Sequence, residues 1–63
     1  MIEVIIERWI QRDGHTDFTW SIWQNGKRAA MGQAKCTAEV AEAEALELCR
    51  RALKREPDRI TRL

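Results

Sequence analysis

The segment Trp20–Arg28 (WSIWQNGKR) constrains the fold of this chain more than any other. It alternates in the manner of a β-strand and then reaches Asn25-Gly26, the pair that two-residue β-hairpin turns prefer. Such a turn fixes which side chains of the two flanking strands lie opposite each other. It therefore separates two tryptophans onto opposite faces of a sheet. We expect Trp20 in the core and Trp23 outside it.

Counting outward from this turn gives the pairing of two strands. One covers residues 17–24, and a weaker one runs from the turn to about residue 35. Trp23 then lies opposite Arg28, a favourable stacking pair. On the other face the turn pairs Ile22 with Ala29, Trp20 with Met31 and Phe18 with Gln33.

Residues 2–11 predict a further strand that precedes this hairpin. Their side chains alternate, with Ile2, Val4, Ile6 and Ile10 on one side and Glu3, Ile5, Glu7 and Trp9 on the other. Asp13-Gly14 marks the turn that follows, but its length leaves two registers open. We treat these as alternatives.

The first alternative is a two-residue turn at Asp13-Gly14. It requires a β-bulge near Glu7-Arg8, which returns Trp9 to the core face. The second is a three-residue turn, Asp13-Gly14-His15, which keeps Ile10 inside and sends Arg8 toward the core. The large apolar side chains left outside are Ile5 with Ile10 in the first register, and Ile5 with Trp9 in the second.

A helix is predicted after the hairpins. Thr37 is a suitable N-cap, and the alanine-rich residues 38–46 favour helix strongly. Pro57 disfavours helical geometry at the residue before it, so we expect the helix to end near Arg55. Apolar side chains form one stripe along it: Ala38, Ala41, Ala45, Leu46, Leu48, Cys49, Ala52 and Leu53.

Together these elements predict a single α+β domain over residues 1–63. Its sheet is a three-stranded antiparallel meander in the order 1-2-3, packed on one C-terminal helix. The expected core contains Val4, Ile6, Phe18, Trp20, Ile22, Met31, Ala45, Leu46, Leu48, Cys49, Ala52 and Leu53. In the tail, Ile60 and Leu63 either pack back on the domain or meet a partner.

The length of 63 residues limits the core, because ordering each residue costs about 1.5 kcal/mol of conformational entropy. Small domains offset this cost with disulfides, a metal or association. Cys36 and Cys49 follow no leader-like segment, so we expect free thiols in a cytoplasmic setting. His15 is the single histidine and no Cys-x-x-Cys spacing occurs, so we expect no zinc. The remaining way to stabilise so small a domain is association with a second copy or with another protein.

Charge and hydropathy bear on the other partners. The net charge is +1 although 33% of the residues are charged, which argues against a general nucleic-acid or membrane coat. No apolar run approaches the roughly 18 residues that cross a bilayer. We interpret the basic residues near the C-terminus as a solvated face that complements the helix dipole: Arg50, Arg51, Lys54, Arg55, Arg59 and Arg62.

No combination of side chains predicts catalysis. A nucleophile needs a base within hydrogen-bond reach, yet His15 falls in an expected surface turn. Cys36 precedes the helix N-cap as a small corner residue, and Cys49 lies in the apolar stripe. We therefore expect no enzyme activity, no cofactor and no small-molecule substrate.

One family resemblance covers about residues 16–53. The pattern Trp20-x-Ile22-x-x-Asn25-Gly26-Lys27-Arg28, then Gly32 and Thr37-Ala38-Glu39 before an alanine-rich helix, resembles the sheet-plus-helix DNA-binding domains of phage-integrase arm-binding and AP2 type. Members of that family insert a three-stranded sheet into the major groove. The resemblance implies that Trp23 and Arg28, with Arg8 or Lys35, would face DNA. Glu3 and Glu7 depart from that pattern, because carboxylates repel phosphate.

The uncovered aromatic side chains are the clearest functional signal. Exposed aromatics beside arginine are typical of binding hot spots. The candidate binding residues are Trp23, Arg28, Ile5, Trp9 and Arg8. We expect a non-catalytic interaction module that binds itself or another protein through the outer sheet face or an unpaired edge strand. DNA binding by the same face is the alternative.

Overall fold

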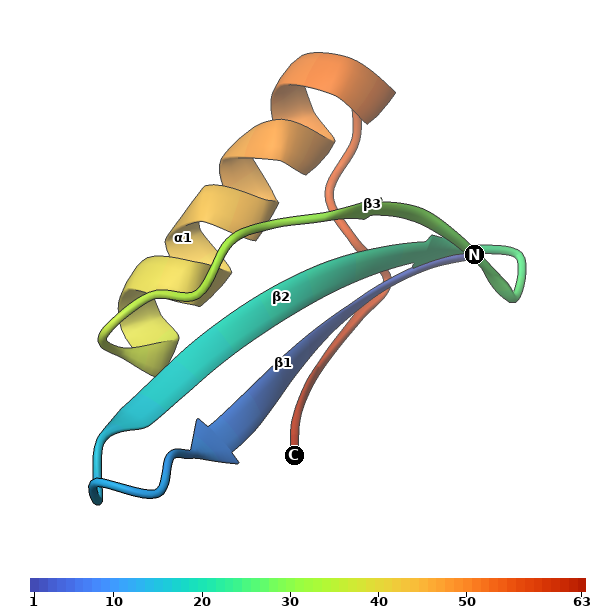
Figure 1. Ribbon diagram of the computed structural model, residues 1–63. Coiled ribbons are helices and arrows are strands. Elements are labelled where there is room, and N and C mark those ends of the chain that lie inside the picture. Colours follow the sequence, from blue (N-terminus) through green and yellow to red (C-terminus); the bar gives the residue numbers. More distant parts are fainter.

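The computed structural model describes residues 1–63 and has an α+β fold with one helix and a four-stranded sheet. Figure 1 labels the helix and the first three strands, and the fourth strand lies in the red C-terminal segment beside the first strand. The strands are β1 (Ile2–Ile10), β2 (Thr16–Gln24), β3 (Lys27–Met31) and β4 (Arg59–Arg62). Their order in the sheet is β3-β2-β1-β4. The first three strands run antiparallel, as predicted, whereas β4 runs parallel to β1, so the sheet is mixed.

β4 corrects the predicted three-stranded meander. After the helix the chain returns to the far side of β1 and pairs Val4 with Ile60. Without this strand, the nine-residue β1 would be a long sheet edge with unpaired backbone groups. The tail residues Ile60 and Leu63 were expected either to pack back on the domain or to meet a partner. Ile60 packs back with β4 and is 39% exposed, whereas Leu63 is 69% exposed.

β1 and β2 pair in a register that neither expected turn produces. Ile6 lies opposite Trp20 and Val4 opposite Ile22, without a bulge, so both predicted registers were wrong. The faces are nevertheless those of the second alternative, with Arg8 on the core side and Trp9 outside. Unbroken alternation from Ile2 therefore places the core side chains of β1 on one face.

A five-residue loop, residues 11–15, sets this register. The His15 N–H donates to Asp13 Oδ1 at 2.9 Å, and the Gln11 N–H donates to the His15 carbonyl at 2.7 Å. Gly14 supplies the positive φ of 86° that the loop needs. Because Asp13 bonds within the loop, the turn is wider than the Asp-Gly pair suggests.

The β2–β3 hairpin follows the prediction only beside its turn. Asn25 and Gly26 both have positive φ (52° and 82°), and Trp23 lies opposite Arg28 as predicted. A bulge then shifts the register.

Beyond the bulge, Ile22 meets Ala30 instead of Ala29, and Ser21 meets Met31. Met31 was predicted in the core but the shift turns it to the other face, where it is 61% exposed. A second shift pairs Phe18 with Lys35 instead of Gln33.

The helix α1 (Ala38–Leu48) begins as predicted, with the Thr37 hydroxyl accepting the Val40 N–H at 3.1 Å. It continues as a π-helical turn, η1 (Cys49–Leu53), and stops at Lys54, which has a left-handed φ of 62°. The helical segment thus ends slightly before Arg55. No helix in the chain is long and apolar enough to cross a membrane.

The core lies between α1 and one face of the sheet. Its buried members are Ile2, Val4, Ile6, Trp20, Ile22, Ala41, Ala45 and Cys49. Three further predicted members, Phe18, Leu48 and Leu53, are half-buried against it, and Leu46 is half-buried as well. Ala52 was wrongly predicted as core, because the wider π-helical turn leaves it exposed. Burial also raises the pKa of the Cys49 thiol.

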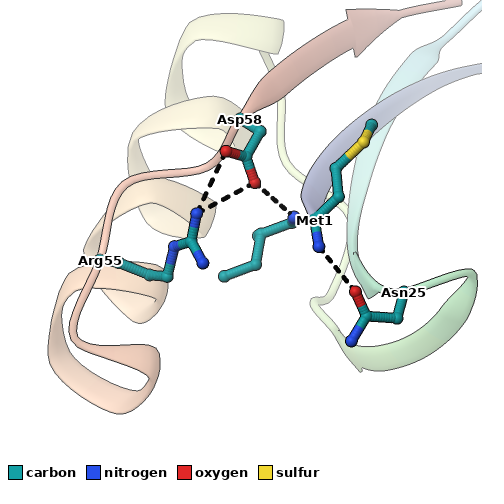
Figure 2. Close-up of polar contacts among 5 residues, drawn as sticks. Met1, Asn25, Arg55 and Asp58 are labelled. Carbon is teal, nitrogen blue, oxygen red and sulfur yellow. Dashed lines mark hydrogen bonds and ion pairs between the residues drawn. The ribbon is translucent and has the colours of Figure 1, made fainter.

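Hydrogen bonds join Asp58, the residue before β4, to the start of β1 (Figure 2). The Ile2 N–H donates to Asp58 Oδ2 at 2.7 Å, and the Asp58 N–H donates to the Ile2 carbonyl at 2.7 Å. Arg55 Nη2 approaches both oxygens of the same carboxylate, at 3.1 and 3.2 Å. On the other side of β1, the amino group of Met1 donates to Asn25 Oδ1 at 2.6 Å.

A substitution at Gly32 tests how closely the Trp20 ring packs against the backbone at this position. A Cβ at this position would overlap Nε1, Cε2 and Cζ2 of the indole ring. Gly32→Ala should therefore lower the free energy of unfolding by about 1–3 kcal/mol, measured by urea denaturation. In a Trp20→Phe background the same change should cost less, because phenylalanine lacks those ring atoms. An equal cost in both backgrounds would contradict this packing.

Asp58 should make stability depend on pH. The Ile2 N–H, and then Arg55, hold the pKa of Asp58 below its usual 3.8. A carboxyl with a lowered pKa in the folded state stabilises above its unfolded pKa and loses that contribution as the pH falls through the folded value. The unfolding free energies of wild type and Asp58→Asn should therefore differ most near neutral pH and converge below 3.8.

Urea titrations at several pH values measure this convergence. Glu47→Gln is the matched control, because it removes the charge of an exposed helix carboxylate. Its difference in unfolding free energy from wild type should stay nearly constant over the same pH range. A gap between wild type and Asp58→Asn that stays constant across the acid range would refute the role given to the carboxylate charge.

Candidate functional site

The sheet face turned away from α1 is the candidate binding surface, here named the outer face. Figure 1 shows that α1 covers the opposite face and that no helix lies over this one. All four strands contribute to it, as their registers show. Its side chains are Glu3, Ile5, Glu7, Trp9, Asp17, Thr19, Ser21, Trp23, Arg28, Met31, Arg59 and Thr61.

Trp23 occupies one end of the outer face, between Arg28 on β3 and Glu3 on β1. Its Nε1 donates to Ser21 Oγ at 2.9 Å, so the indole lies along its own strand. A shallow pocket of about 210 Å³ adjoins the ring, lined by Met1, Glu3, Ile5, Trp23 and Gly26. The pocket brings together two of the predicted binding residues, Ile5 and Trp23.

β4 adds a charged group that the sequence analysis did not assign to this face. Arg59 Nε and Nη2 lie 2.9 and 2.8 Å from Glu3 Oε2, and the Thr61 hydroxyl donates to the same oxygen at 3.1 Å. The available signal was the alternation of polar Arg59 and Thr61 about apolar Ile60, shortly after Pro57. Three alternating residues are too few to identify a strand by themselves.

Trp9 marks the other end of the outer face and is 53% exposed. Its Nε1 donates to Thr19 Oγ1 at 3.3 Å. The neighbouring charges are acidic: Glu7 precedes it on the same face, and Asp17 lies opposite on β2. Asp17 is itself held by the loop, with His15 Nε2 at 2.7 Å from Oδ1.

The structure gathers four of the five predicted binding residues on the outer face: Trp23, Arg28, Ile5 and Trp9. Arg8 is the exception. It lies opposite Phe18 on the helix side of the sheet, because β1 alternates without a bulge. Ile10 lies on that side as well, beyond the core, and is 71% exposed.

Most of the C-terminal basic cluster is engaged in ion pairs. Arg50 pairs with Glu56, Arg55 with Asp58, Arg59 with Glu3, and Arg62 with Glu39 and Glu42. The hydrogen bond to Glu42 is the main cause that raises the pKa of Arg62. Neighbouring carboxylates therefore compensate most of this cluster, which was interpreted as a solvated face.

A second concavity, of about 560 Å³, lies between α1 and the end of β3. Glu44 is its main polar group: it accepts from Trp20 Nε1 at 2.9 Å and lies 2.9 Å from Lys35 Nζ. The contact with Lys35, and then that with Trp20, lowers the pKa of Glu44. The carboxylate thus secures a core indole. No group of three or more His, Cys, Asp or Glu side chains is placed to hold a metal ion.

Tryptophan fluorescence in solution should distinguish the buried Trp20 from the two tryptophans of the outer face. Trp20 is 5% exposed and Trp9 is 53% exposed, whereas Trp23 is half-buried at the pocket. A Trp9→Phe, Trp23→Phe double variant should retain only a blue-shifted emission that acrylamide quenches weakly. A Trp9→Phe single variant keeps Trp23 and serves as the control, with stronger quenching. Equal quenching of both variants would contradict this assignment.

Comparison with other proteins adds no family to this description. The DNA-binding domains named above have a three-stranded sheet, whereas this chain adds a fourth strand, β4, parallel to β1. The role of the outer face is therefore argued from its own residues. No family model, curated protein or solved structure matches the chain.

Proposed function

We propose that this chain is a non-catalytic interaction module that binds a protein through the outer face of its sheet. The observation that carries the proposal is the set of large apolar side chains on a face that no helix covers: Trp9, which is 53% exposed, and the half-buried Ile5 and Trp23, the latter beside Arg28. The reducing, cytoplasmic setting suggested by its two free cysteines is part of the same proposal.

The indole N–H groups favour a dry contact. Trp23 donates to Ser21, and Trp9 donates to Thr19, both within the face. A tryptophan whose N–H is already bonded can be covered by apolar atoms without leaving a donor unsatisfied. Both rings can therefore enter a protein interface with little polar cost.

The sheet edges favour the face over edge pairing. The free edges are β3, with five residues, β4, with four, and the last four residues of β1 (7–10), which β4 does not pair. The register of β3 also shifts beyond Arg28. Short and irregular edges are poor templates for an added strand.

The charges of the face favour a protein over DNA. It carries three carboxylates, Glu3, Glu7 and Asp17, against the guanidinium groups of Arg28 and Arg59. Arg59 is already paired with Glu3. A surface that binds the phosphate backbone needs an excess of free positive charge, so DNA remains the weaker candidate.

Site-specific photocrosslinking tests the proposal in cells. A photoreactive phenylalanine at Trp23 should give a crosslinked product with a protein, whereas the same group at Val40, an exposed position on α1, should not. Val40 is the matched control, because it is apolar and lies on the helix. The mass of the product distinguishes a second copy from another protein.

Two outcomes would overturn the proposal. One is the absence of a protein product from position 23 under conditions where the chain stays folded. The other is binding of mixed-sequence duplex that weakens steeply with salt and is lost in Arg28→Ala, since this supports DNA as the ligand.

A further inference from the structure

We infer that the occupant of the outer face is a second copy of this chain, packed face to face with its strands antiparallel to those of the first. The inference rests on the proposed function and names its partner. Its basis is the distribution of charge along the face, which is complementary to itself.

The two ends of the outer face have opposite charge. At the Trp23 end, Arg28 lies free beside the indole, and the charge of Arg59 is balanced by Glu3. At the Trp9 end, Glu7 and Asp17 are the charged side chains of the face. Arg8 does not offset them, because it points to the helix side, and Arg12 lies in the loop. About 20 Å separates Trp23 from Asp17 at roughly 3.3 Å per residue.

This asymmetry selects one symmetric arrangement. A two-fold axis in the plane of contact and across the strands lays the arginine end of each copy over the acidic end of the other. Arg28 then lies near Asp17 of the second copy, twice in each dimer. An axis parallel to the strands would instead lay Arg28 over the Arg59–Glu3 pair of the second copy, where the carboxylate is already engaged and offers Arg28 no free partner.

The size of the face fits a dimer of modest affinity. The area of the face follows from a strand spacing of about 4.8 Å and a rise of ~3.3 Å per residue. With two strands of about nine residues and two of about half that length, the face covers roughly 430 Å² in each copy. Two copies then bury roughly 860 Å², below the ~1,000 Å² expected of a stable specific interface and in the range of weak, transient ones. We therefore expect a dimer that depends on concentration, anchored by Trp9 and Trp23 and aligned by the charges.

Sedimentation equilibrium over a concentration series at low salt tests the inference on the whole chain. Wild type should show a monomer–dimer equilibrium that weakens with added salt. Arg28→Glu should raise the dissociation constant by about tenfold or more, because each symmetric contact is lost twice. Arg51→Glu makes the same charge change on the exposed side of the helical segment and should leave the equilibrium unchanged.

A mixture of two charge-reversal variants, studied in the same sedimentation experiment, gives the decisive comparison. Arg28→Glu and Asp17→Lys should each dimerise poorly alone but form a heterodimer together, because both cross-copy pairs then have opposite charge. Asp17 also holds the loop through His15, so far-UV circular dichroism checks that its variant is folded. If Asp17→Lys does not fold, the comparison of Arg28→Glu with Arg51→Glu still decides.

The outcomes separate this inference from the proposed function. A strict monomer at all concentrations, or equal dimerisation of Arg28→Glu and Arg51→Glu, overturns the second copy as partner. If position 23 then still crosslinks to another protein, the proposed function stands. If it crosslinks to nothing, both fail.

Discussion

The docking of β4 beside β1 is the interaction on which the rest of the structure depends. Asp58 and Ile2 exchange backbone and side-chain hydrogen bonds at the start of this pairing. β4 then covers the first half of the edge of β1, joins Arg59 to Glu3 on the outer face and joins Arg62 to Glu42 of the helix. One short strand thus connects both layers of a domain whose buried core contains only eight apolar residues.

The helix can lie close to the sheet because its contact side chains are small. Ala41, Ala45 and Cys49 are fully buried, and Gly32 gives the Trp20 ring room at the edge of the core. Every large apolar side chain on the outer face is left outside this contact. The same alternation that fills the core therefore also supplies the candidate site.

Local chemistry made part of this structure predictable from the sequence. The Asn25-Gly26 turn, the Thr37 cap and the alternation of β1 each depend on neighbouring residues, and each is found. The errors arose where distant contacts decide. The bulge in β3 moved Met31 out of the core. Arg59 was missed because β4 is a strand only through its pairing with β1.

The pairing of β1 with β4 also has a consequence for the order of folding. It joins residues 56 positions apart, whereas both hairpins and the helix form from near neighbours. Contacts of such long range close late, because the entropy of the intervening chain must be lost first. Until β4 docks, β1 presents an open edge beside the uncovered tryptophans. An open strand edge is a template for pairing with other chains, and the docking of β4 covers the half of that edge nearest the start of β1.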